Sequence, residues 1–219
     1  MDLQQNPNNG QVLRNTEMGE LLFNLTSFPQ YKTFLEIGTW KGNGTTRCIV
    51  DGLLNRVEKG DTDIHFWSIE ANKEFYTIAR ELWEPKGLPF LHLLYGKLHT
   101  QGLMSAQEIE THLYFPNIVT HYQLWYGQDV IDYGRSPYIR PELFPPRIDV
   151  VLLDGGEFCG YADWLALKDK KPKVVILDDT NVMKNERVYK ELKSDSNYTM
   201  RIDRNERHGW AVFERCMND

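Results

Sequence analysis

The sequence predicts an α/β fold: a doubly wound, mostly parallel seven-stranded sheet with helices on both faces and a C-terminal antiparallel hairpin. Short apolar and β-branched runs alternate with segments of helical spacing, which is the order of parallel strands joined by crossover helices. The run 148–154 is almost continuously apolar, as expected of a strand covered on both faces. The last two runs lie close enough in sequence to pair as an antiparallel hairpin.

The first half of the chain follows this alternation closely. Apolar residues at helical spacing predict a first helix over 12–28. Pro85 and Gly87 mark the end of the helix that begins at Lys73. The elements expected in this half are a helix over 12–28, a strand over 34–37, a helix over 45–54, a strand over 64–70, a helix over 73–83 and a strand over 90–95.

In the second half, a long segment interrupts the alternation. About fifty residues, 98–147, precede the next clear strand, which is far more than a usual connection. The remaining expected elements are a strand over 148–154, a helix over 161–169, a strand over 173–178, a helix over 182–192 and paired strands over 198–203 and 209–214. We therefore expect one domain over 1–219, with a polar tail and helix over 1–30 and an insertion over 98–147.

Composition argues against several classes of protein. The net charge of −6, without a long basic run, argues against a nucleic-acid partner. No stretch approaches about 18 consecutive apolar residues, so we expect no membrane span. The start of the chain lacks the basic and apolar regions of a signal peptide. Cys48, Cys159 and Cys216 are scattered, which indicates a reducing, cytoplasmic compartment and incidental thiols rather than a cysteine-based metal site.

The most informative segment, 36–46, has the pattern of a strand end, a glycine turn and a helix N-terminus. Its glycines let the backbone take positive φ values and let a ligand approach the main chain. Open α/β sheets bind their ligands at this carboxyl edge. The spacing departs from G-x-G-x-x-G, which argues against a pyrophosphate ligand. The candidate ligand-binding residues are Glu36, Gly38, Thr39, Gly42, Gly44 and Thr45.

A second candidate group follows the next two strands. Glu70 ends the second strand, where a carboxylate can accept hydrogen bonds from both ribose hydroxyls of an adenosine. The alternative is a solvated acid at a strand end. Ala71 comes next in the chain, and Gly96 ends the third strand, where such folds line the adenine pocket. We include all three in the predicted cofactor site.

Acidic residues also end the fourth and fifth strands, at Asp154 and at the pair Asp178 and Asp179. Carboxylates in one crevice repel one another unless a cation or a proton intervenes. A hard divalent ion such as Mg²⁺ or Mn²⁺ prefers oxygen ligands, so these three residues are candidate metal ligands. The alternative is that Asp154 contacts only the cofactor while the pair caps the next helix.

The insertion is rich in aromatic residues with polar neighbours. Tyr122, Trp125 and Tyr126 are candidate substrate-binding residues, because aromatic faces suit a sugar ring that carries hydroxyls at its edge. The alternative is that these aromatics pack a helical cover onto the sheet. His208, before the last strand, is a candidate general base or a bystander.

Taken together, these motifs resemble the class I S-adenosylmethionine (SAM) methyltransferases over roughly 34–215. The turn matches their motif (D/E)-x-G-x-x-x-G-x-(S/T), and Asp154, Asp178 and Asp179 match the metal ligands of the metal-dependent O-methyltransferases. The chain has no lysine near Asp154 in sequence like that of the catechol-type enzymes. A narrower resemblance is to methyltransferase domains of glycan-building enzymes, including those of large DNA viruses of algae.

The resemblance implies a Rossmann-like fold and methyl transfer from SAM to a hydroxyl of a sugar or other small acceptor that enters beneath the insertion. The implied metal, Mg²⁺ or Mn²⁺, would orient that hydroxyl with the help of Asp179, and Asp154 or His208 would take its proton. If the chain is viral, its compartment is the host cytoplasm. A homodimer and attachment to a larger glycosyltransferase polypeptide stay open.

Two other functions remain open at this point. A nicotinamide-dependent oxidoreductase would use a similar sheet but needs the absent G-x-G-x-x-G. A non-catalytic glycan- or SAM-binding module would keep Gly38 and Glu70 without turnover, because fold alone does not decide function.

Overall fold

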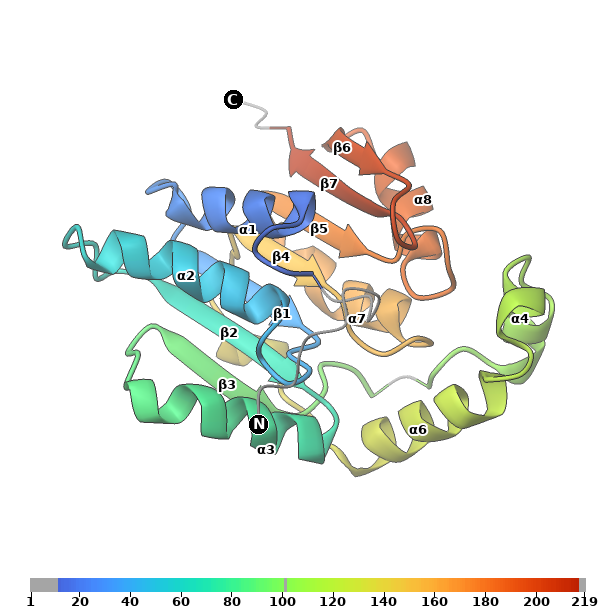
Figure 1. The fold of residues 1–219 in the computed structure, drawn as a ribbon. Coiled ribbons are helices and arrows are strands. Elements are labelled where there is room, and N and C mark those ends of the chain that lie inside the picture. Colours follow the sequence, from blue (N-terminus) through green and yellow to red (C-terminus); the bar gives the residue numbers. More distant parts are fainter. Residues whose placement is uncertain (1–11, 101, 217–219) are drawn as a thin grey trace.

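The computed structural model describes residues 12–100 and 102–216, so the polar tail expected at the start of the chain lies outside the described residues. A seven-stranded sheet with strand order β3-β2-β1-β4-β5-β7-β6 forms its centre (Figure 1). The strands are β1 (Thr33–Ile37), β2 (His65–Glu70), β3 (Leu91–Tyr95), β4 (Val150–Leu153), β5 (Val174–Asp178), β6 (Tyr198–Arg204) and β7 (Trp210–Arg215). The first five strands are parallel, whereas β7 pairs antiparallel with both β5 and β6. The predicted fold class is confirmed.

Helices cover both faces of the sheet, because successive strand residues point to opposite sides. Phe34 of β1 packs in the same cluster as Leu53 of α2, while its neighbour Leu35 packs with Trp164 of α7 on the other face. Figure 1 shows α1 and α2 on one face and α7 on the other. The helices flanking the sheet are α1 (Glu17–Ser27), α2 (Thr45–Val57), α3 (Lys73–Trp83), α7 (Gly160–Leu167) and α8 (Glu186–Ser194), with 3₁₀ turns at Glu84–Lys86, Pro141–Leu143 and Lys168–Lys170.

The insertion forms an arm of short helices that projects beyond the sheet (Figure 1). It contains α4 (Ala106–Glu110), α5 (Phe115–Ile118) and α6 (Tyr122–Arg135). The arm has its own small apolar cluster, in which Ile109 and Ile118 contact Phe158 and Met183 from loops at the sheet edge. The arm is therefore anchored where β4 and β5 end.

Two helices begin several residues later than the sequence predicts, and side-chain hydrogen bonds explain both starts. The first helix begins at Glu17, because Thr16 caps it by accepting a hydrogen bond of 3.1 Å from the Gly19 N–H. The last helix begins at Glu186 instead of 182. The Asn185 side chain donates to the carbonyls of Leu153 (2.9 Å) and Asp178 (2.7 Å), which holds the preceding residues in a loop.

Within the described residues, the structure contains no helix that is long and apolar enough to cross a membrane.

A buried cation ties α2 to the loops that flank β1. The Arg56 guanidinium donates to the Tyr31 carbonyl (2.6 Å) and to the Asp61 carboxylate (2.6 Å), and its side chain is 4% exposed. Asp61 also pairs with Lys32 at 2.7 Å, so removing the Arg56 side chain mainly leaves the Tyr31 carbonyl without its donor and empties a buried site.

Arg56→Ala should therefore lower the free energy of unfolding by about 2 kcal/mol, measured by urea titration. The matched control is Arg47→Ala on the same helix, where the arginine is 61% exposed and lies 3.8 Å from Asp51. This change should cost less than about 0.5 kcal/mol. Equal losses in the two variants would show that the buried contacts of Arg56 contribute nothing specific.

Candidate active site

A cavity of about 1090 Å³ opens at the carboxyl ends of the parallel strands. This is the edge at which open α/β sheets bind their ligands. Its wall combines the glycine turn after β1, the ends of β2, β4 and β5, one side of α6 and the loop before β7. The predicted site residues that line it are Gly38, Thr39, Gly44, Thr45, Glu70, Ala71, Gly96, Asp154, Asp178, Asp179 and His208.

The glycine turn begins at Gly38, where β1 passes very close to β4. Gly38 has φ +95°, and a Cβ placed on it would lie 2.0 Å from the carbonyl oxygen of Asp154. Its N–H also donates to the carbonyl of Ile69 at 2.9 Å. Only glycine allows both this backbone conformation and this approach. The turn therefore joins the ends of β1, β2 and β4 at the cavity.

Two residues assigned to the cofactor from sequence, Glu36 and Gly42, lie behind the turn. Glu36 is fully buried and accepts hydrogen bonds from the hydroxyls of Thr46 (2.6 Å) and Ser68 (2.5 Å). The Gly42 carbonyl accepts a hydrogen bond of 2.8 Å from the Trp83 indole N–H. Both residues are placed to hold the turn, and the structure does not bring them to the cavity surface.

Glu70 lies in the cavity wall with its carboxylate fixed by the main chain. Its two oxygens accept from the N–H groups of Trp40 and Asn72, each at 2.7 Å. A carboxylate has about four lone-pair positions, so capacity remains for two further donors. Burial raises the pKa of Glu70 to about 7. Glu70 therefore changes charge near neutral pH.

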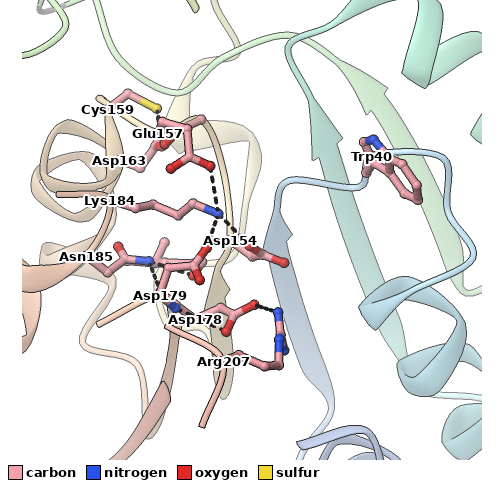
Figure 2. Close-up of polar contacts among 12 residues, drawn as sticks. Trp40, Asp154, Glu157, Cys159, Asp163, Asp178, Asp179, Lys184, Asn185 and Arg207 are labelled. Carbon is pink, nitrogen blue, oxygen red and sulfur yellow. Dashed lines mark hydrogen bonds and ion pairs between the residues drawn. The ribbon is translucent and has the colours of Figure 1, made fainter. Parts of the chain in front are cut away.

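The predicted acidic cluster forms, but it contains cations from the chain itself (Figure 2). The ligand oxygens of Asp154, Asp178 and Asp179 lie within 4.8 Å of one another. The Lys184 ammonium reaches between two of these side chains, 3.0 Å from Asp154 and 2.6 Å from Asp179. The Arg207 guanidinium lies 2.8 Å from Asp178. The repulsion that the sequence indicated is thus offset by a lysine and an arginine.

The electrostatics of this cluster favour a charged lysine. Lys184 is 7% exposed, and burial alone would lower its pKa. The surrounding carboxylates, Asp154 first and then Glu157 at 3.7 Å, outweigh this effect and raise the pKa of Lys184. Burial would raise the pKa of Asp179, but the charges of Lys184, first, and of Arg207 and His208 together lower it.

The insertion contributes polar residues that the sequence analysis did not select. Gln128, Asp129, Asp132 and Tyr133, all on α6, line the cavity. Asp129 accepts a hydrogen bond of 3.1 Å from the Phe158 N–H, and burial raises its pKa to about 7. Their helical spacing, three or four residues apart in the C-terminal half of the helix, was the signal available in the sequence.

The three predicted substrate-binding aromatics lie elsewhere on this helix. The rings of Tyr122 and Tyr126 pack edge-on against Phe158, with centroids 6.2 and 5.5 Å away. Trp125 is 38% exposed and stacks on His121 at 5.3 Å. None of the three belongs to the described cavity lining. Tyr122 and Tyr126 thus pack within the arm, as in the alternative, whereas Trp125 lies at its surface, and a substrate-binding role for the three stays a prediction.

Cys159, treated as incidental in the sequence, belongs to a buried polar group near the cavity. The ligand atoms of Cys159, His99 and Asp163 lie within 4.8 Å of one another. Burial, together with the Asp163 charge, raises the pKa of the Cys159 thiol well above its usual value.

No protein-family model and no curated protein matches the chain. Solved structures do resemble it. A methyltransferase from Geobacter sulfurreducens aligns with 93% of this chain and 80% of its own, at 13% identity and a TM-score of 0.56. The O-methyltransferase TomG from Streptomyces achromogenes, in complex with SAM, aligns with 90% of this chain and 79% of its own, at 18% identity and a TM-score of 0.56.

An O-methyltransferase from Bacillus cereus, in complex with S-adenosylhomocysteine, aligns with 91% of this chain and 80% of its own, at 16% identity and a TM-score of 0.55. Identities this low show a shared fold. The chain therefore has the Rossmann-like fold of these methyltransferases.

The close approach at Gly38 makes a testable prediction about stability. Gly38→Ala should lower the free energy of unfolding by at least about 3 kcal/mol, because it adds a clash with the Asp154 carbonyl to an unfavourable φ. Gly60→Ala is the matched control, since Gly60 has φ +89° but no neighbouring atom lies within 4 Å of where its Cβ would be. It should cost about 1 kcal/mol, the backbone effect alone. If the two variants lose similar amounts of unfolding free energy in urea titrations, the close approach of Gly38 to Asp154 does not contribute to stability.

Proposed function

We propose that this chain is a SAM-dependent O-methyltransferase whose acceptor is a hydroxyl group of a sugar or glycan. The observation that carries the proposal is the arrangement of Glu70 and the glycine turn at the same cavity as a carboxylate, Asp154, that can take a proton. The shared fold with O-methyltransferases solved in complex with SAM or S-adenosylhomocysteine supports it.

The residues present fit SAM on chemical grounds. The spare acceptor capacity of Glu70 suits ribose hydroxyls, and the backbone of the glycine turn at Gly38 and Gly44 lines the cavity. The cavity wall carries many more carboxyl than basic side chains, the basic ones being Lys97, Lys184 and Arg207. Such a field favours a sulfonium cation over the pyrophosphate of a nicotinamide dinucleotide.

The same charge balance bears on the acceptor. An anionic acceptor would be repelled, whereas a neutral polyhydroxylated one can donate hydrogen bonds to Asp129, Asp132 and Gln128 of α6. These residues take the place that the sequence analysis gave to the aromatics of the insertion. A neutral sugar carries no negative charge and has several hydroxyl donors, so it fits this wall of the cavity.

In the proposed reaction, SAM supplies an electrophilic methyl group, and the chain positions the acceptor and removes its proton. Asp154 is placed to take that proton, because it ends β4 next to the glycine turn and lines the cavity. Asp179 lies on the other side of Lys184 from Asp154. His208 is exposed and lines the same cavity. The three candidate metal ligands converge, yet Lys184 and Arg207 already pair with them, so no step here uses a metal ion.

Binding of S-adenosylhomocysteine tests the cofactor. It should raise Tm, with a stabilisation of about 2.7 kcal/mol at a hundredfold excess over Kd, whereas NADH should leave Tm unchanged. Affinity measured by calorimetry should rise between about pH 6 and pH 8, because Glu70 ionises near pH 7 and an ionised carboxylate accepts hydroxyl hydrogen bonds more strongly.

Glu70→Gln should weaken binding at pH 8 by about tenfold and flatten this pH profile. Glu74→Gln, an exposed change four residues further along the chain, is the control and should do neither. A Tm shift with NADH but none with S-adenosylhomocysteine would refute the proposal.

Proton removal is tested separately, by release of S-adenosylhomocysteine in the presence of a panel of neutral sugars. Asp154→Asn should lower kcat by at least about a hundredfold, the usual scale of a lost general base, while Kd for S-adenosylhomocysteine changes by less than about threefold. His208→Ala should lower kcat by less than about tenfold. The reverse order of effects would assign the base to His208.

A further inference from the structure

The loop between β5 and α8 places Lys184 where the acidic residues of the cavity meet (Figure 2). Its Nζ lies 3.0 Å from Asp154 Oδ1 and 2.6 Å from Asp179 Oδ2, so both carboxylates accept hydrogen bonds from one ammonium group. A divalent ion shared by the same two oxygens would sit about 2.1 Å from each. The ammonium group already donates to both oxygens and adds a positive charge beside them, so the lysine and the ion compete for the same two ligands.

The third candidate metal ligand, Asp178, is also engaged. Its Oδ2 accepts from the Arg207 guanidinium at 2.8 Å, and its Oδ1 accepts from the Asp179 N–H at 3.1 Å. Asp178 is 1% exposed. A metal would therefore have to displace two side-chain cations to gain three protein ligands.

Lys184 cannot withdraw easily, because its backbone is packed against a helix and held by its neighbour. The Lys184 carbonyl lies so close to Gly160, at the start of α7, that a Cβ there would be 2.1 Å away. The next residue, Asn185, is fully buried and bonds to the carbonyls at the ends of β4 and β5. Removing the ammonium from this place would also leave buried carboxylates uncompensated.

We propose that Lys184 stands in for the divalent cation: its ammonium group holds Asp154 and Asp179 in place, and the site functions without a metal ion. Lys184 is thus a positioning residue that acts through Asp154. The metal-binding part of this inference stands on the geometry alone, whereas its turnover part rests on the proposed methyl transfer.

Titration with Mn²⁺, followed by electron paramagnetic resonance, tests the first part in the absence of any substrate. The wild-type protein should show no site tighter than about 1 mM. Lys184→Ala frees the two carboxylates and should bind one Mn²⁺ at least about tenfold more tightly. Lys184→Met keeps most of the alkyl stem, and therefore the loop packing, and should also gain affinity. Lys190→Ala removes a lysine that is 66% exposed and should leave Mn²⁺ binding as in the wild type.

The Mn²⁺ affinity of the wild-type protein tests the inference even if neither Lys184 variant folds. One Mn²⁺ bound to the wild type more tightly than about 1 mM would overturn the inference. So would folded Lys184 variants that gain no affinity.

The second part is tested by turnover in EDTA. The wild type should keep its full rate, while Lys184→Ala should lose at least about tenfold in kcat and recover part of it with Mg²⁺ or Mn²⁺. Loss of wild-type activity in EDTA, with recovery on adding Mg²⁺, would refute metal-independent function. If S-adenosylhomocysteine does not bind at all, the proposed methyl transfer fails, and the Mn²⁺ titration still decides the role of Lys184.

Discussion

One buried carboxylate, Glu36, holds together the edge of the sheet on which the cavity depends. It is fully buried at the end of β1 and accepts hydrogen bonds from Thr46 of α2 and Ser68 of β2. Ser68 also bonds to Thr39 in the glycine turn, at 2.5 Å between the hydroxyl oxygens. Directional hydrogen bonds in a low-dielectric interior fix geometry more strictly than apolar contacts do. The turn is therefore held in place where it borders the cavity.

The structure of the opposite wall of the cavity, at the ends of β4 and β5, depends on ion pairs as well as on burial. Lys184 and Arg207 balance the carboxylates that converge because parallel strands all end at one edge. Buried ion pairs add little net stability, since desolvation offsets much of their attraction, but removing one partner is costly. Such pairs fix positions more than they stabilise the fold. The ends of β4 and β5 are thus held at a defined separation, with Asp154 facing the cavity.

The fold was predictable because the buried strands are short and mostly apolar, and because β1, β2, β4 and β5 each end near an acidic residue. The glycine turn and Glu70 were predictable for the same reason, since their positions follow from the strand ends. The role of Lys184 could not be predicted from the sequence. Its contact with Asp154 joins residues thirty positions apart, and it depends on a loop that sequence periodicity assigns to a helix. The Asn185 side chain donates a hydrogen bond to the Asp178 carbonyl, which prevents that helix from starting earlier. Helix propensities do not include such side-chain bonds to distant backbone groups.

The insertion shows how one side of a helix can serve two purposes along its length. Tyr122, Tyr126, Asp129 and Tyr133 are spaced to share one side of α6, but only the C-terminal part of that side reaches the cavity. The N-terminal part packs on Phe158 in the arm's own cluster. Which part reaches the cavity depends on where the arm leaves the sheet, and this is set by the tertiary structure. The aromatic part therefore stabilises the arm, and the polar part supplies hydrogen-bonding groups to the cavity.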